Sequence, residues 1–128
     1  MRIVFTLFLS FVFLSSSAQV RKVVIKTFPS GQPEVIYHLK GKEMNAEKIK
    51  EEVYYENGKL EYTGEFKNGT EHGEWVYYYP SGNIKAKEYW KNGVEHGTWK
   101  EYHPDGQLAR EIVYKDGKIV DTVVKKRQ

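Results

Sequence analysis

The chain has 128 residues, enough for one domain, and 20 lysines and arginines against 17 aspartates and glutamates give it a formal net charge of +3. Charges of both signs are interleaved and no concentrated basic face is present, so nucleic acid is excluded as the expected partner. The chain has no cysteine, which excludes disulfide bonds and a lipid-modified cysteine anchor.

The first 18 residues have the pattern of a secretory signal peptide. Arg2 gives a positive start, residues 3–14 are largely apolar, and the small residues Ser16 and Ala18 mark a cleavage site. A retained membrane anchor is the alternative, but it needs about 20 apolar residues to cross a bilayer. We therefore expect residues 1–18 to be removed, leaving no transmembrane anchor. The exported chain would act in the periplasm, the outer envelope or the extracellular space.

The rest of the chain, residues 19–124, has the composition of a β-structure. It contains all ten tyrosines and all three tryptophans, which favour pleated, half-buried strands over helices. The first predicted strand runs from Val20 to Phe28 and ends at the turn sequence Pro29-Ser30-Gly31. A second predicted strand covers residues 34–39.

Residues 43–50 break the rhythm of the chain, because the preceding and following glycines, Gly41 and Gly58, are further apart than the later equivalent pairs. This segment is predicted to be an irregular insertion, either a single helical turn capped by Asn45 or a long hairpin loop. The basic residues 125–128 are predicted to form a solvated tail.

From residue 51 onward, glycines recur at alternating intervals of 11 and 13 residues, each after Asn, Ser or Asp. They are Gly58, Gly69, Gly82, Gly93, Gly106 and Gly117. Such dipeptides supply the positive φ of tight hairpin turns. The pattern predicts an all-β fold, in which 24-residue units of two strands form an antiparallel meander of successive β-hairpins. The result would be an elongated, twisted, single-layer sheet.

The turn after Tyr79 permits two registers. An even loop places Tyr79 opposite Ile84, whereas a three-residue loop with Gly82 in the left-handed region brings Tyr78 beside Ile84. A slip of one residue exchanges the two faces of the sheet, so the sequence leaves open which aromatic side chains share a face.

The stretch from Gly73 to Tyr102 repeats a glycine followed two residues later by tryptophan, at Trp75 and again at Trp99. It resembles the MORN-repeat variant of bacterial proteins in the YwqK antitoxin family, and the resemblance extends over roughly residues 29–120. It implies a ribbon of hairpins and a binding or scaffolding role, without catalytic residues common to the family.

Two Glu-His pairs, at His72 and His96, are the candidates for a metal site. Equivalent positions one unit apart are separated by two strands, about 9.5 Å, whereas zinc holds its histidine nitrogens at about 2.0–2.1 Å. His103 lies at the other end of its strand. These residues are therefore interpreted as polar turn residues, and no metal or cofactor is expected.

No motif of a known catalytic site is present in the chain, which is therefore predicted not to be an enzyme. Six carboxylates fall within predicted strands and are interpreted as partners in cross-strand ion pairs. These are Glu61, Glu65, Glu74, Glu88, Glu101 and Glu111.

Aromatic side chains recur at the repeat period and are expected to form columns along the ribbon. Each can pack across strands, and a column left exposed can bind a partner. The candidate binding surface consists of Tyr54, Tyr78, Tyr102, Trp75, Trp99, Tyr89 and Trp90. The predicted function is non-enzymatic protein interaction or scaffolding with an unknown protein partner. The alternatives are binding of a cell-envelope glycan or lipid headgroup, and antitoxin-like neutralisation of a partner toxin.

Overall fold

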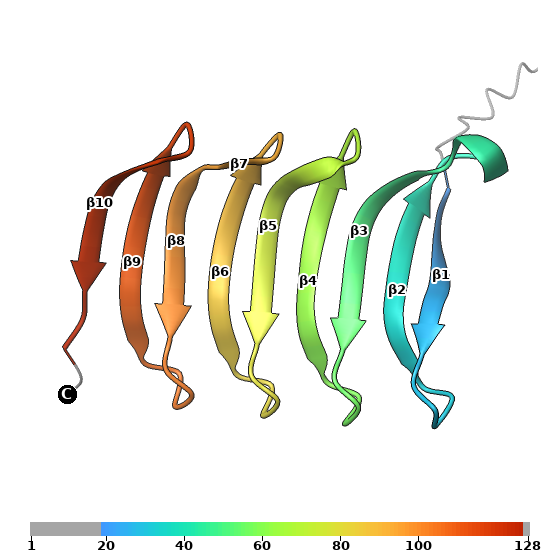
Figure 1. Cartoon of the computed structure of the whole chain (residues 1–128), viewed down its shortest axis with the longest axis horizontal. Coiled ribbons are helices and arrows are strands. Elements are labelled where there is room, and N and C mark those ends of the chain that lie inside the picture. Colours follow the sequence, from blue (N-terminus) through green and yellow to red (C-terminus); the bar gives the residue numbers. More distant parts are fainter. Residues whose placement is uncertain (1–18, 127–128) are drawn as a thin grey trace, which may run out of the picture.

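The computed structural model describes residues 19–126, and these form one open antiparallel sheet (Figure 1). The strands are β1 (Val20–Thr27), β2 (Pro33–Lys40), β3 (Glu47–Tyr54), β4 (Leu60–Lys67), β5 (Thr70–Tyr78), β6 (Ile84–Lys91), β7 (Val94–Glu95), β8 (Gly97–Tyr102), β9 (Leu108–Lys115) and β10 (Lys118–Val124). The strands from β1 to β6 pair in chain order, and the order continues from β6 to β8, β9 and β10. The short β7 also pairs with β6. The predicted all-β meander is confirmed.

The hairpins at the two ends of the strands differ in type. At one end, Asn68 and Gly69 both have positive φ, 51° and 77°, the geometry of a two-residue type I′ turn. At the other end, the Tyr79 N–H donates to the Asn83 carbonyl at 2.8 Å, and Gly82 has a φ of 96°. Tyr78 pairs with Ile84. The loop that places Gly82 in the left-handed region is therefore the one that forms.

Two glycines bend the strands of the central units. Gly73 inside β5 has a φ of 71°, and Gly97 at the start of β8 has a φ of 70°. The pairing of β4 with β5 shifts register between Gly64 and Phe66, as at a β-bulge. Both strands curve toward the type I′ turns (Figure 1). The glycines that precede Trp75 and Trp99 by two residues are thus bend residues of β5 and β8.

The predicted irregular insertion at residues 43–50 is wrong in its extent. A short 3-10 helix covers Glu43–Asn45, and its N-cap is Lys42, which makes no side-chain capping bond. Asn45 lies inside this turn and does not cap it. Residues 47–50 belong to β3, where Lys50 pairs with His38 of β2. The extra residues are accommodated in the hairpin between β2 and β3.

The ends of the chain fall partly outside the described residues. Residues 1–18, predicted to be a signal peptide, lie outside them, as do the last two residues of the predicted basic tail. At Lys125 the backbone N–H still donates to the Ala109 carbonyl at 2.9 Å. Within residues 19–126, no helix is long and apolar enough to cross a membrane.

The buried hydrophobic residues lie in β5 and β9. Within residues 19–126 they are Trp75, Val76 and Ile112, with exposed fractions of 8%, 6% and 7%. Gly64 of β4 pairs with Trp75 of β5, and a Cβ at position 64 would overlap the indole ring. The glycine therefore lets a large ring lie flat against the backbone of the neighbouring strand.

We expect Gly64→Ala to lower the free energy of unfolding by about 1–3 kcal/mol, the range for overpacking a tight contact. Thermal and denaturant unfolding of the variant would measure this loss. In a Trp75→Phe background the same change is expected to cost less, because the smaller ring leaves room for the methyl group. An equal cost in both backgrounds would show that the clash with Trp75 is not the cause.

Candidate functional site

One face of the sheet carries most of the large rings. We call it the aromatic face, and it is defined by Tyr62, Phe66, Trp75, Tyr77, Trp90, Trp99 and Tyr114. Side chains alternate between faces along a strand, so Trp75 and Tyr77 share this face whereas Val76 and Tyr78 point to the other. Cross-strand pairing extends the face from Tyr62 through Tyr77 to Ala86.

The rings of the aromatic face form two clusters. In the first, Trp75 stacks on Tyr62 with 5.9 Å between ring centroids and contacts Phe66 edge-on at 5.2 Å. In the second, Trp99 lies 5.1 Å from Trp90 and 4.5 Å from Tyr114. Each contact joins two rings on neighbouring strands. Rings that were predicted to belong to separate columns therefore pack against one another in a patch.

The two central tryptophans are held in the same way. The Nε1–H of Trp75 donates to the carbonyl of Glu65 at 3.1 Å, and the Nε1–H of Trp99 donates to the carbonyl of Tyr89 at 3.0 Å. Each indole is thus fixed to the preceding strand, and the same bond recurs one repeat unit later. Because the two bonds are equivalent, Trp75 and Trp99 occupy the same position in their respective repeat units.

The predicted binding surface is divided between the two faces of the sheet. Tyr54, Tyr78, Tyr89 and Tyr102 lie on the face opposite the tryptophans. There the hydroxyl of Tyr89 donates to Glu74 at 2.8 Å, and Tyr89 is 38% exposed. Trp90 and Trp99 are half-buried on the aromatic face, and Trp75 is buried. The seven candidates therefore do not form one continuous surface, and Trp75 serves mainly in packing.

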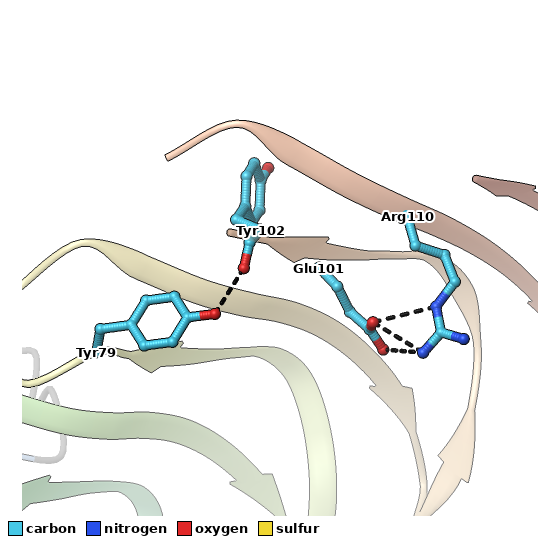
Figure 2. A network of polar contacts seen from close by, with 4 residues as sticks. All are labelled: Tyr79, Glu101, Tyr102 and Arg110. Carbon is cyan, nitrogen blue, oxygen red and sulfur yellow. Dashed lines mark hydrogen bonds and ion pairs between the residues drawn. The ribbon is translucent and has the colours of Figure 1, made fainter. Parts of the chain in front are cut away.

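Two tyrosines outside the predicted set join successive hairpin units. They lie at the end of the strands opposite the type I′ turns. The hydroxyl of Tyr55 donates to the carbonyl of Tyr78 at 2.8 Å. One unit further on, the hydroxyl of Tyr79 donates to the carbonyl of Tyr102, also at 2.8 Å (Figure 2). His103 occupies the next equivalent position. A depression of about 420 Å³ lies beside Tyr79, Ala86 and Tyr102.

The predicted cross-strand ion pairs are confirmed for two of the six carboxylates. Arg110 contacts Glu101 at 2.7 Å (Figure 2), and Lys100 contacts Glu111 at 3.3 Å. Within residues 19–126, no ion pair of the other four is found. Of these, Glu74 and Glu88 accept hydrogen bonds from aromatic side chains.

Glu88 is the carboxylate with the least ordinary surroundings. Its Oε2 accepts a hydrogen bond from the Nε1–H of Trp90 at 3.1 Å, and it also interacts with the hydroxyl of Tyr77. Burial raises the pKa of Glu88, and the negative charges of Glu101 and Glu95 raise it further, although the hydrogen bonds from Trp90 and Tyr77 act in the opposite direction. The net result is a raised pKa, because the hydrogen bonds do not offset the cost of burying the ionised carboxylate.

The two most buried carboxylates of residues 19–126 are Glu51 and Glu52, with exposed fractions of 9% and 8%, and neither was predicted to be a site residue. On the aromatic face, Glu51 accepts a hydrogen bond from Tyr62 at 2.6 Å and lies 3.0 Å from the Lys48 ammonium. That ammonium is also 3.6 Å from the centroid of the Phe66 ring, a cation–π contact. Glu51 and Glu52 are adjacent glutamates in β3, and nothing in the sequence around them indicates that they are buried.

Glu52 faces the other side of the sheet, 2.9 Å from Nε2 of His38 and 3.5 Å from Nζ of Lys22. The hydroxyl of Tyr54 donates to it at 2.9 Å. Burial alone would raise its pKa, but these partners outweigh burial, and the pKa of Glu52 is lowered. Tyr54, a predicted binding residue, is therefore tied to an internal polar cluster.

The two Glu-His pairs make contacts with the backbone of the sheet. His72 accepts the backbone N–H of Asn92 through Nδ1 at 3.4 Å, and the backbone N–H of His96 donates to the carbonyl of Tyr89. Within residues 19–126, no group of three or more His, Cys, Asp or Glu side chains is arranged to hold a metal ion. Both histidines lie where the strands bend toward the turns.

The structure is that of a repeat protein, in which successive β-hairpin units stack side by side. The model of the MORN repeat variant family matches residues 49–68, 71–92 and 95–116, together half of the chain, and the chain belongs to this family. The matches coincide with the three central hairpin units. They are narrower than the stretch from residue 29 to residue 120 over which the resemblance was expected. Comparison with curated proteins and with solved structures finds no match.

The raised pKa of Glu88 gives a signed prediction for stability. Below the ordinary glutamate pKa both the folded and the unfolded state hold the proton, so Glu88→Gln makes little difference. As pH rises toward neutral, the unfolded state ionises first, and stability is lost. We therefore expect Glu88→Gln to raise the melting temperature by a few degrees at pH 7 and to lose this gain near pH 4. Melting curves from pH 3.5 to pH 8 would measure it.

The matched control is Glu74→Gln on the opposite face, which removes a carboxylate bonded to an exposed tyrosine. It is expected to give no pH-dependent gain of this kind. A Glu88→Gln gain that stays constant from pH 3.5 to pH 8 would contradict the electrostatic explanation.

Proposed function

We propose that this chain is a non-enzymatic interaction module that offers its aromatic face to a protein partner. The observation that carries this proposal is the architecture itself, since within residues 19–126 no second layer covers the rings of the single sheet. MORN repeats are generally binding modules, and this supports the assignment. The two clusters bring rigid rings together on one surface, as in the aromatic centre of many protein interfaces.

A second candidate ligand is a cell-envelope glycan or a lipid headgroup, which flat, half-exposed rings can also bind. Trp90, Trp99 and Tyr114 would supply the stacking surface. A role as an antitoxin-like neutraliser in the manner of the YwqK family is a special case of protein binding, in which the partner is a toxin.

The proposal is tested by capturing partners with the tagged chain in its native cells. Trp90→Ala and Tyr114→Ala are expected to weaken capture by about 30-fold or more if these rings are anchors of the interface. Circular dichroism and melting curves would confirm that both variants remain folded. Tyr78→Ala and Tyr102→Ala on the opposite face are matched controls and are expected to leave capture unchanged.

The opposite pattern, with capture lost only in the tyrosine variants, would assign the interface to the other face and overturn the proposal. Titration of glycan fragments and of phospholipid vesicles, followed by tryptophan fluorescence, tests the second candidate. Saturable binding of either, without any captured protein, would favour the envelope ligand.

We further propose that the chain acts after export, as the charged start, apolar run and small residues of positions 1–18 suggest. The expected result is a chain purified from its native cells that begins at Gln19. Intact-mass measurement would show a mass lower by the first 18 residues. Recovery of the full-length mass from every cell fraction would contradict the proposal.

A further inference from the structure

We propose that Glu88, at the centre of the aromatic face, binds an arginine side chain of the protein partner. This inference rests on the proposed function, because it assigns the chemistry of one contact within the same face. It adds a chemical class to a partner that ring packing alone does not specify.

Glu88 lies between the two ring clusters. Glu88 of β6 pairs with Trp75 of β5 in the first cluster. On the other side, Ala86 pairs with Glu101 and Lys87 with Lys100. Continuing that antiparallel register places Glu88 beside Trp99 of the second cluster. A group bound to this carboxylate would therefore lie among the rings of both clusters.

Glu88 differs from Glu51 and Glu101 on the aromatic face in having no basic partner among residues 19–126. Glu51 is paired with Lys48, and Glu101 is paired with Arg110. Across residues 19–126, no basic side chain pairs with Glu88, which is bonded only to neutral donors. Half-buried and without a counter-ion, this carboxylate is complementary to a cation from outside the chain.

The chain itself provides an example of the same chemistry in β3, three strands away from Glu88. The ammonium of Lys48 lies 3.0 Å from Glu51 while it sits over two rings, 3.6 Å from the centroid of Phe66 and 4.5 Å from that of Tyr37. A carboxylate and aromatic rings on this face thus hold a cation where the sequence supplies one. At Glu88 the rings and the carboxylate are present, and the partner supplies the cation.

Arginine fits this place better than lysine for geometric reasons. A guanidinium is planar, stacks on indole rings and can donate two parallel hydrogen bonds to one carboxylate. Its weak hydration also lowers the cost of entering a half-buried site. Bound arginine would favour the ionised form of Glu88, so affinity is expected to fall as pH decreases through the pKa of this carboxyl group.

The test uses NMR of the ¹⁵N-labelled chain, purified after expression of the full sequence. The three tryptophans give three indole N–H signals, and Trp90 donates its indole hydrogen bond directly to Glu88. A capped Gly-Gly-Arg-Gly-Gly peptide is expected to shift the signals of Trp90 and Trp99 saturably at millimolar concentration. The titration gives the affinity of the arginine peptide. The same peptide with neutral citrulline in place of arginine is expected to bind with at most a tenth of this affinity.

Two variants separate the site from general charge effects. Glu88→Gln is expected to weaken the arginine peptide about tenfold or more, whereas Glu74→Gln on the opposite face should leave it within about twofold. Equal binding of the citrulline peptide, undiminished binding by Glu88→Gln, or the absence of any shift would overturn the proposal. Tighter binding of tetramethylammonium than of the arginine peptide would also overturn it, since that result points to a quaternary ammonium ligand.

Failure of this inference is distinguishable from failure of the proposed function. If partner capture is lost in Trp90→Ala but unaffected by Glu88→Gln, the aromatic face binds a protein without an arginine at this place. If no aromatic-face variant affects capture, the proposed function fails, whatever the peptides do.

Discussion

The structure depends on one physical constraint: a sheet of a single layer has no opposing layer in which to bury its side chains. It must therefore obtain its packing from contacts between neighbouring strands. Trp75 shows how this is achieved, because its ring lies over the backbone at Gly64 and stacks on Tyr62. The rings that stabilise the sheet are for this reason also the rings on its surface, and structure and recognition draw on the same side chains.

The bend at the type I′ end of the strands follows from the same constraint. Gly73 and Gly97 adopt positive φ, and they precede the two central tryptophans by two residues. The indole hydrogen bonds to the preceding strand then fix each ring. A glycine and a tryptophan at this spacing thus form one structural device, which explains why the two recur together.

The fold was predictable from the sequence because its turns use residues with few alternatives. Asn68 and Gly69 have the positive φ that their dipeptide predicts. The division of the candidate surface was less accessible, because the faces depend on the loop after Tyr79, for which two registers were compatible with the sequence. The burial of Glu51 and Glu52 was not predictable. His38 reaches Glu52 only once β2 and β3 are paired. Lys48 lies in the same strand as Glu51, and a register shift in the pairing of β2 with β3 separates the two residues.

The distribution of charge distinguishes the two halves of the aromatic face. In the N-terminal half, Lys48 forms an ion pair with Glu51 from within the same strand, so the negative charge of Glu51 is balanced by the chain itself. In the central half, the positions one and two repeat units after Glu51 are Trp75 and Trp99, and the carboxylate Glu88 lies on β6 opposite Trp75. His72, one repeat unit after Lys48, does not supply the missing charge, because its Nδ1 accepts a backbone N–H at the bend. The rings thus recur from unit to unit, whereas among residues 19–126 no basic side chain pairs with Glu88, and this carboxylate is left to a cation from the partner.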